Sequence, residues 1–411
     1  MRKFLQRKKD FVIIMKEEEY LKQRQQEADI LSYKFLQAHN KYPIQQNKIV
    51  FSSFEGDGGF GCNPRYIAEE LHKLDGSLEM IWLLHDTKKE FPAYIEPVKD
   101  SVENTVYHLA TAKVWIDNYR KPYGALKREG QLYIQTWHGS MGIKAVGLYR
   151  GSLFPKIARM VSEWDSSLCD YVLSDSEYND NIYPKKLLYN GPTLRTGFPR
   201  IDCLINDKNK LRIKLHQKYG IKNETRCLLF APTFRGGNQT GNKKVISEIS
   251  TINFDSLLQV LEKKYNCKWR ILLRLHPQLS AKMSKMKCMQ ENSMSIDVSQ
   301  EPDVSQILGG CDLVITDYSS IAFDAGYAGI PVLLYADDFD DYVQNRGKIM
   351  WTRDELPFIM SETNEELMEA IEKFNYEEFM NKMQKFMKYH GVVEDGKAGQ
   401  RVAEFILKFI N

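Results

Sequence analysis

The sequence lacks the features of several protein classes. It has no apolar run of about 18 residues, so no segment is expected to span a membrane. Its seven cysteines form no C-x-x-C pair and its eight histidines show no zinc-type spacing, so we expect reduced thiols in a cytosolic protein. The formal net charge is only +3, which does not favour a nucleic-acid partner. We therefore expect no metal, no cofactor and no nucleic acid.

Short apolar segments instead alternate with helical stretches along most of the chain. Residues 10–40 are polar and contain neither Gly nor Pro, which predicts one long helix. The alternation that follows is typical of parallel α/β sheets. The expected strands are 48–54, 80–86, 113–118, 132–139, 170–176 and 193–202, then 227–233, 269–277, 313–318 and 331–336.

A polar, basic stretch near 206–226 divides the two runs of strands. We predict four parts: an N-terminal helical extension, two doubly wound α/β domains and a C-terminal helix. Their expected bounds are 1–45, 46–205, 206–395 and 396–411. Ligands bind at the carboxyl ends of such strands, so the predicted site is the cleft between the two domains.

A glycine-rich turn follows the first strand, with Gly56, Gly58 and Gly61 in a G-x-G-x-x-G spacing. In the dinucleotide fingerprint the helix begins inside this motif and its N-terminus holds the pyrophosphate. Here Asn63 and Pro64 follow the third glycine, so we expect the helix to begin later, with Asn63 as its cap. A flexible turn beside a substrate cleft is therefore favoured over a NAD site, which stays an alternative.

The strongest site signal is the segment "TDYSSIAFD". A buried strand ends at Thr316 and Asp317, and Ser319 and Ser320 then open a helix. The first N–H groups of a helix have no internal partner and carry the positive end of its dipole. Such a turn suits a nucleotide diphosphate, although a plain serine cap is the alternative.

Three further side chains follow predicted strand ends. Arg235 comes after "APTF" and His276 lies in "LRLHP", both in the second run of strands, and His138 lies in "QTWHGS" in the first. Arginine offers a bidentate fork to phosphate oxygens. A histidine facing the cleft can take a proton from an attacking hydroxyl, because imidazole titrates near neutrality. A structural histidine at a strand end is the alternative for His138.

In this order and spacing, "TWHGS", "APTFR", "LRLHP" and "TDYSSIAFD", followed by "IPVLLYADDFDDY", resemble the CDP-glycerol glycerophosphotransferase family of teichoic-acid primases and polymerases, over about residues 48–390. The resemblance implies a GT-B fold, with two Rossmann-like domains facing a central cleft. It also implies a reaction. Glycerol phosphate, or another polyol phosphate, passes from CDP-glycerol or CDP-ribitol to a hydroxyl of a membrane lipid-linked saccharide or polyol-phosphate acceptor, and CMP is released. The product would be teichoic acid or a capsule-type polymer.

The resemblance also assigns roles. His138 matches the family's proposed general base, and His276 matches the histidine thought to hold or stabilise the pyrophosphate. The matching substrate-binding positions are Arg235, Thr316, Asp317, Ser319 and Ser320. A carboxylate beside an anion costs free energy, so we expect Asp317 to orient its loop and not to touch phosphate.

The sequence departs from the family pattern after the first of these histidines. The family often reads Trp-His-Gly-Thr-Pro, whereas here Gly139 and Ser140 are followed by Met141 and Gly142. Ser140 keeps the hydroxyl and Lys144 keeps a cation nearby. We predict that Gly139, Ser140 and Lys144 lie on the acceptor side, and the departure leaves the acceptor's identity open.

A lipid-linked acceptor implies a peripheral protein on the cytoplasmic face of the cell membrane. The basic N-terminus and the basic stretch 208–218 are the expected membrane contacts. Glycerol or ribitol, one addition or many, teichoic acid or capsule, and monomer or homo-oligomer all stay open. The competing functions are a GT-B glycosyltransferase that uses a UDP- or GDP-sugar, and a non-catalytic nucleotide-binding or scaffold protein of the cell-envelope machinery.

Overall fold

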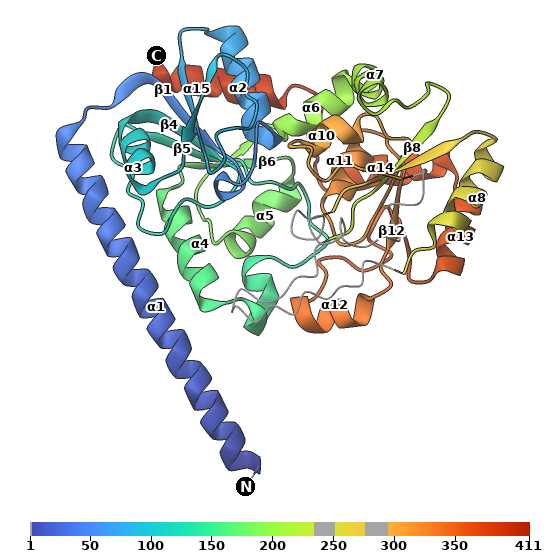
Figure 1. Ribbon diagram of the computed structural model, residues 1–411, viewed down its shortest axis with the longest axis horizontal. Coiled ribbons are helices and arrows are strands. Elements are labelled where there is room, and N and C mark those ends of the chain that lie inside the picture. The colour runs from blue at the N-terminus through green and yellow to red at the C-terminus, as the bar shows by residue number, and fades with distance from the viewer. Residues whose placement is uncertain (1, 234–250, 276–294) are drawn as a thin grey trace.

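The computed structural model describes residues 2–233, 251–275 and 295–411 (Figure 1). Within them, the side chains of residues 2–15 and 346 are not described. Two predicted site residues, Arg235 and His276, lie outside the described residues.

The first sheet is parallel and has the order β3-β2-β1-β4-β5-β6-β7. Its strands are β1 (Gln45–Ser52), β2 (Glu79–Leu84), β3 (Ile95–Lys99), β4 (Ala112–Asp117), β5 (Leu132–Gln135), β6 (Tyr171–Ser174) and β7 (Thr193–Arg195). The order starts at a central strand and reverses between β1 and β4, which creates a switch point at their carboxyl ends.

The second sheet repeats this plan in the order β10-β9-β8-β11-β12-β13, again with parallel pairing. Its strands are β8 (Arg226–Phe230), β9 (Trp269–Leu273), β10 (Ser295–Asp297), β11 (Leu313–Thr316), β12 (Val332–Tyr335) and β13 (Ile359–Ser361). Two doubly wound Rossmann-like units of this kind form a GT-B fold, which confirms the predicted fold class.

Helices cover both sheets. Among the described residues they are α1 (Arg2–Lys41), α2 (Cys62–Leu74), α3 (Val102–Thr111), α4 (Lys156–Leu168), α5 (Glu177–Lys186), α6 (Pro199–Asn206), α7 (Lys208–Tyr219), α8 (Phe254–Tyr265), α10 (Val304–Leu308), α11 (Ile321–Tyr327), α12 (Phe339–Arg346), α13 (Asn364–Lys373), α14 (Tyr376–Tyr389) and α15 (Ala398–Ile410), with short 3-10 turns η1 (Phe54–Gly56) and η2 (Gly147–Leu153). Figure 1 shows the two lobes side by side, and α1 leaves the first lobe as a single long helix. The last helix, α15, packs on α2 and α6.

The central strands bury both faces. In β1, Ile49 and Phe51 belong to the core that includes Leu71 of α2, whereas Val50 belongs to the core that includes Phe35 of α1. This alternation is the period of a strand, and burial on both sides explains why the segment reads as a continuous apolar run.

The expected strand 193–202 is wrong in its second half. The strand β7 ends at Arg195, Gly197 adopts a left-handed φ of 85°, and Pro199 begins α6. Proline suits the first turn of a helix because its fixed φ is helical and it lacks the N–H that would be unpaired there.

The expected cap of α2 is also wrong. The helix begins at Cys62 with Gly61 as its N-cap, directly after the glycine motif. The Asn63 side chain does not cap it, because its amide donates to the carbonyls of Thr136 and Trp137, each at 3.1 Å. A Cβ on Gly61 would lie 2.8 Å from the Pro302 carbonyl oxygen, so this glycine permits close approach of the second lobe.

Candidate active site

A cleft of about 350 Å³ lies between the two lobes. His138 and Phe54 line it from the first lobe, and Ser319, Ser320 and Arg274 line it from the second. Both serines follow the carboxyl end of β11, and His138 follows that of β5. Ligands of such folds bind at this edge.

The ring of His138 is held in one orientation. Its Nδ1 lies 2.7 Å from the carbonyl oxygen of Asn118. A carbonyl only accepts hydrogen bonds, so Nδ1 carries the proton and Nε2 is left as an acceptor. The rings of Tyr119 and Phe54 pack against it, with centroids at 5.7 and 5.5 Å.

The surroundings keep His138 neutral. Burial is the largest cause that lowers its pKa, and the charges of Arg200, Lys144 and Arg120 act in the same direction. Against the opposing hydrogen bond to Asn118, the pKa falls to about 3. At neutral pH the imidazole is therefore a proton acceptor.

Strained backbone surrounds this histidine. Phe54, Glu55, Cys62 and Trp137 all have a left-handed φ, between 50° and 57°. Such conformations are costly for residues with a side chain, and they concentrate where loops must aim groups at a functional site. Phe54 and Cys62 line the cleft, and Trp137 precedes His138.

The turn that carries His138 touches the serine turn. A Cβ on Gly139 would lie 2.6 Å from Ser320 Oγ and 3.2 Å from Ser320 Cβ. Only glycine allows this approach without displacing the serine. Ser319 and Ser320 are half-buried, so both are accessible from the cleft.

Two predicted substrate-binding residues do not reach the cleft surface. Thr316 is fully buried, and its hydroxyl donates to the Ala231 carbonyl at 2.6 Å. The Asp317 carboxylate accepts from the Thr233 N–H at 2.9 Å and from its hydroxyl at 2.6 Å. Both residues tie the end of β11 to the segment after β8.

Two others lie beside the cleft. Ser140 is fully buried, its hydroxyl donates to Asp324 Oδ1 at 3.3 Å, and its carbonyl accepts from Lys186 at 3.2 Å. Lys144 is exposed and lines a neighbouring pocket that His138 shares.

A buried ion pair that was not predicted from the sequence joins the lobes. Arg200 of α6 lies 2.7 Å from Asp324 of α11, and the two residues are only 3% and 2% exposed. Both also line the cleft. Both residues lie in segments that the sequence made visible: Asp324 ends "TDYSSIAFD" and Arg200 lies in "GFPRID". The pair was missed because "GFPRID" was expected to be part of a strand.

Arg274 is a second cation at the cleft that the sequence analysis missed. Its guanidinium donates to the carbonyls of Val298 at 3.1 Å and Glu301 at 2.8 Å, which fixes its position. Burial lowers its pKa. The residue stands in "LRLHP", two positions before His276.

Within the described part of the chain, no group of three or more His, Cys, Asp or Glu side chains is arranged to hold a metal ion. No helix described there combines the length and apolar character needed to cross a membrane.

Comparison with known proteins identifies the family. A sequence model of the family described as CDP-Glycerol:Poly(glycerophosphate) glycerophosphotransferase matches residues 33–408. The chain belongs to this glycerophosphotransferase family. The family is one of transferases, as the resemblance implied.

Several curated members of the glycerophosphotransferase family are similar along most of the chain. A teichoic acid poly(glycerol phosphate) polymerase of Staphylococcus epidermidis is 28% identical, over 89% of this chain and 51% of its own length. A polymerase of the same description from Bacillus spizizenii is 26% identical, over 89% of this chain and 93% of its own length. A teichoic acid ribitol-phosphate primase of Bacillus spizizenii is 27% identical, over 92% of this chain and 95% of its own length. The chain thus spans about half of the first relative and nearly all of the other two.

Solved structures are also similar to this chain along nearly its whole length. The wall teichoic acid polymerase TagF superposes with a TM-score of 0.78 at 26% identity, covering 97% of both chains. A TagF variant soaked with CDPG superposes with a TM-score of 0.76 at the same identity and coverage.

Proposed function

We propose that the protein transfers a polyol phosphate from a CDP-polyol to a hydroxyl of an acceptor and releases CMP. One observation carries the proposal: a neutral, oriented His138 lies across the cleft from Ser319 and Ser320. Relatives described as glycerol-phosphate and ribitol-phosphate polymerases support this substrate class.

In the proposed mechanism, the donor diphosphate binds at the serine turn beside Arg274. By their motif matches, Arg235 and His276 assist there. The acceptor oxygen attacks the phosphorus that bears the polyol, and the bond from this phosphorus to the bridging oxygen breaks. Nε2 of His138 takes the hydroxyl proton and CMP leaves. Positioning and charge neutralisation supply most of the catalysis in such transfers.

A donor screen tests this function. Purified full-length protein with an acceptor is expected to release CMP from CDP-glycerol or CDP-ribitol, and no UDP or GDP from the matching sugar nucleotides. Release of UDP or GDP would establish the glycosyltransferase alternative. If a donor is bound but not consumed, the non-catalytic nucleotide-binding alternative gains support, and if none is bound, the scaffold alternative does. Mass spectrometry of the product identifies the polyol and counts the units added.

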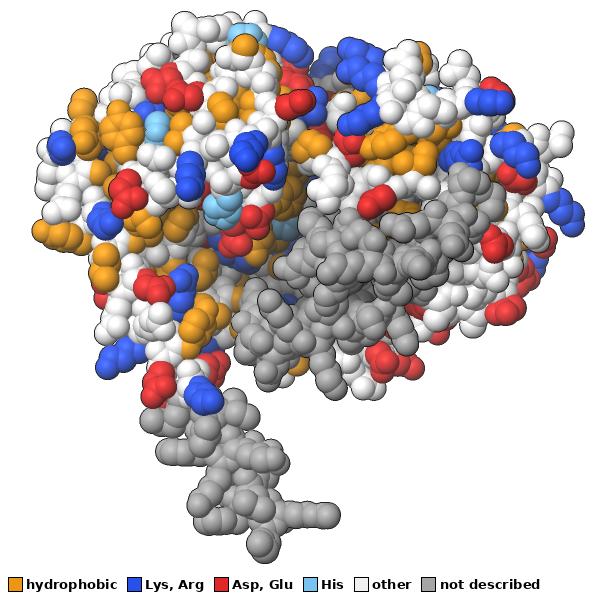
Figure 2. All heavy atoms as spheres, in the orientation of Figure 1, with side chains coloured by type: hydrophobic (Ala, Val, Ile, Leu, Met, Phe, Trp, Pro, Cys, Tyr) orange, Lys and Arg blue, Asp and Glu red, His pale blue; other side chains and the backbone are white. Residues whose placement is uncertain are grey.

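We also propose a lipid-linked acceptor in cell-envelope polymer synthesis, and a peripheral position on the cytoplasmic face of the membrane. The basic stretch 208–218 forms most of α7, where Lys210, Lys214 and Lys218 are exposed beside Ile213. Figure 2 shows basic side chains gathered over this helix. Such surfaces bind anionic lipid. If the protein fails to sediment with anionic vesicles at low salt, the membrane proposal is wrong.

The pH dependence of the reaction is expected to differ between kcat/KM and kcat. In the free cleft the pKa of His138 lies at about 3, so protonation should not reduce kcat/KM around the ordinary histidine value of 6.5. A bound diphosphate opposes the charges of Arg200, Lys144 and Arg120, which raises the pKa of His138. The acid limb of kcat should therefore lie at higher pH than that of kcat/KM. Profiles whose acid limbs coincide at 6.5 would contradict this ordering.

A further inference from the structure

Two buried side-chain amides hold the residue that precedes His138. Trp137 has a left-handed φ of 51°, a conformation that persists only where the surroundings enforce it. Its N–H donates to Oε1 of Gln135 at 2.9 Å, and its carbonyl accepts from Nδ2 of Asn63 at 3.1 Å. The peptide groups on both sides of Trp137 are therefore fixed by side chains.

The amide of Asn63 uses its oxygen and both of its hydrogens. The second Nδ2 hydrogen goes to the Thr136 carbonyl at 3.1 Å, and Oδ1 accepts the Arg200 N–H at 3.1 Å. A reversed amide would set its oxygen against two carbonyls, so these partners permit one orientation only. Asn63 is fully buried. It thus links the backbone before His138 to the first turn of α6.

Gln135 acts on both sides of the histidine. It is the last residue of β5 and is buried, and its Nε2 donates to the Tyr119 carbonyl at 2.7 Å. Tyr119 follows Asn118, whose carbonyl accepts from Nδ1 of His138. Gln135 therefore fixes the backbone before His138 and also the loop to which the His138 ring is bonded.

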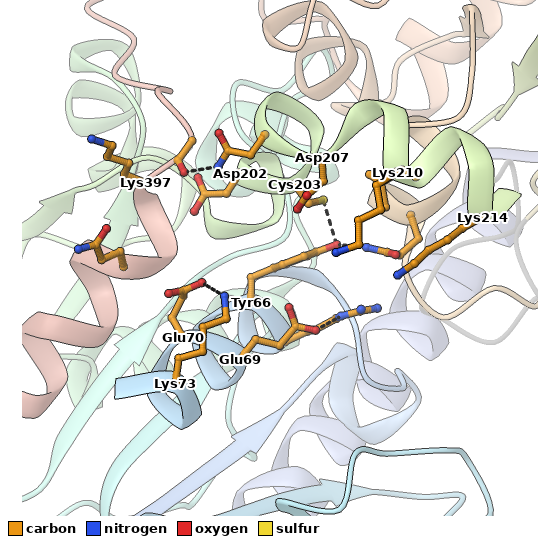
Figure 3. A pocket seen from close by; sticks show the side chains of 16 residues that line it. Tyr66, Glu69, Glu70, Lys73, Asp202, Cys203, Asp207, Lys210, Lys214 and Lys397 are labelled. Atoms are coloured by element: carbon orange, nitrogen blue, oxygen red, sulfur yellow. Dashed lines mark hydrogen bonds and ion pairs between the residues drawn. The ribbon is translucent and has the colours of Figure 1, made fainter. Parts of the chain in front are cut away.

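Asn63 reaches this turn from a fixed support. It lies in the first turn of α2, and Cys62 before it has a left-handed φ of 57°. One turn further along α2, the Tyr66 hydroxyl accepts from the Cys203 thiol of α6 at 3.1 Å. Figure 3 shows these two side chains pointing toward each other in a groove of about 580 Å³ between α2 and α7. Since α2 contacts α6 through both Asn63 and Tyr66, the Asn63 amide is held precisely in place.

The local preference of Asn63 is not what places it. Asparagine is among the preferred helix caps, yet α2 begins with Gly61 at its N-cap and has no side-chain cap. The side chain is committed to the turn before His138 instead. Departures from local preference of this kind are expected at functional sites.

We propose that Asn63 and Gln135 are positioning residues, which together set the His138 ring to receive the acceptor's proton. The inference rests on the proposed function, because it concerns the base of that reaction. Neither amide is among the described residues that line the cleft, so both act through His138 and not on the substrate. Misplacing a catalytic group by about 1 Å can lower a rate about 10²-fold.

Steady-state kinetics test the inference. The full-length protein is assayed with CDP-glycerol as donor and a short glycerol-phosphate oligomer as acceptor. Asn63→Ala and Gln135→Ala are each expected to lower kcat about 10- to 100-fold. KM for CDP-glycerol should stay unchanged, because neither side chain contacts the serine turn. A rise in this KM with kcat unchanged would overturn the inference.

Gln131→Ala is the matched control. Gln131 is a third buried amide of the first lobe, and it precedes β5 at the amino end of the strand, away from the cleft. Its Nε2 donates to the carbonyls of Leu109 and Ala112 at 2.7 and 2.6 Å, and its Oε1 accepts the Arg128 N–H at 3.0 Å. The control variant loses hydrogen bonds of the same kind, so urea unfolding should show a similar loss of stability while kcat stays unchanged. If kcat falls equally in the control, the loss of activity follows stability and the inference is wrong.

Asn63→Asp keeps the size of the side chain and removes only part of its bonding. The carboxyl group can still accept the Arg200 N–H, but it has at most one hydrogen for the carbonyls of Thr136 and Trp137. Its kcat should therefore also fall below that of the unaltered protein. Turnover equal to that of the unaltered protein would show that the bonds to the histidine turn are not needed.

Nitrogen NMR of the histidine rings separates the inference from the proposed function. In the unaltered protein His138 should show one tautomer, with the proton on Nδ1, and its signals are assigned by their absence in His138→Ala. Asn63→Ala and Gln135→Ala should release the ring and populate both tautomers, whereas Gln131→Ala should not. If the unaltered protein releases no CMP from any CDP-polyol yet shows this pattern, the proposed function fails and the positioning role stands. If His138 keeps one tautomer in every variant, the positioning role is wrong whatever the activity.

Discussion

Replacing His138 by alanine is expected to lower kcat by about 10²- to 10⁴-fold, the usual contribution of a general base. In the structure Nδ1 donates to Asn118, so Nε2 is the atom free to accept the acceptor's proton. The alanine variant loses this acceptor but keeps the serine turn, so CDP-glycerol should still bind. CMP release and calorimetric donor binding measure the two effects separately.

His72→Ala is the control for this variant. His72 stacks on Tyr94, with centroids 3.9 Å apart, and does not line the cleft. Its loss should leave turnover near that of the unaltered protein. If the His138 variant turns over within about threefold of the His72 variant, His138 is not the base.

Replacing Asp324 by alanine is expected to lower the free energy of unfolding by about 3–5 kcal/mol. The change leaves Arg200 buried without its partner, because the pair lies 2.7 Å apart with almost no exposure. It should also lower kcat/KM. Asp324 holds both Arg200 and the Ser140 hydroxyl to the helix that follows the serine turn, and so fixes that turn relative to His138. Urea unfolding and CMP release measure the two losses.

Two comparisons make this second prediction specific. Glu163→Ala breaks an exposed ion pair with Arg159 and should cost no more than about 1 kcal/mol. The double variant Arg200→Met with Asp324→Leu removes both charges and should recover much of the stability, but not the activity. If Asp324→Ala is no less stable than Glu163→Ala, the pair does not hold the lobes together. Full recovery of activity in the double variant would show that the pair does not position the site.

Much of the fold could be predicted from local patterns. The apolar segments of β1, β4, β8 and β11 could be identified as strands because a parallel sheet buries both faces. The start of α2 could not, because the sequence "GCNPRY" contains a good cap in Asn63. Its side chain instead joins the loop after β5, at Thr136 and Trp137. Competition between partners far apart in the chain overrode the local preference.

The candidate site, too, could be predicted only in part from the sequence. The motif "WHGS" indicated His138 and Gly139, and "TDYSS" indicated the serines, because each follows a strand end. The sequence did not show that the Thr316 side chain is fully buried, because the environment of the last strand residue depends on its neighbouring strands. In the structure its hydroxyl meets Ala231, at the end of the adjacent β8.

By itself, the sequence determined the two α/β units, the serine turn after a strand end and the histidine after another, because strand alternation and helix-start chemistry are local properties. Only the tertiary structure decided which side chains meet across the lobes. Arg200 and Asp324 stand 124 positions apart in the chain and on different lobes, and Gly139 meets Ser320 only where the lobes touch. Such contacts depend on how two separately formed surfaces pack, and no local pattern encodes that arrangement.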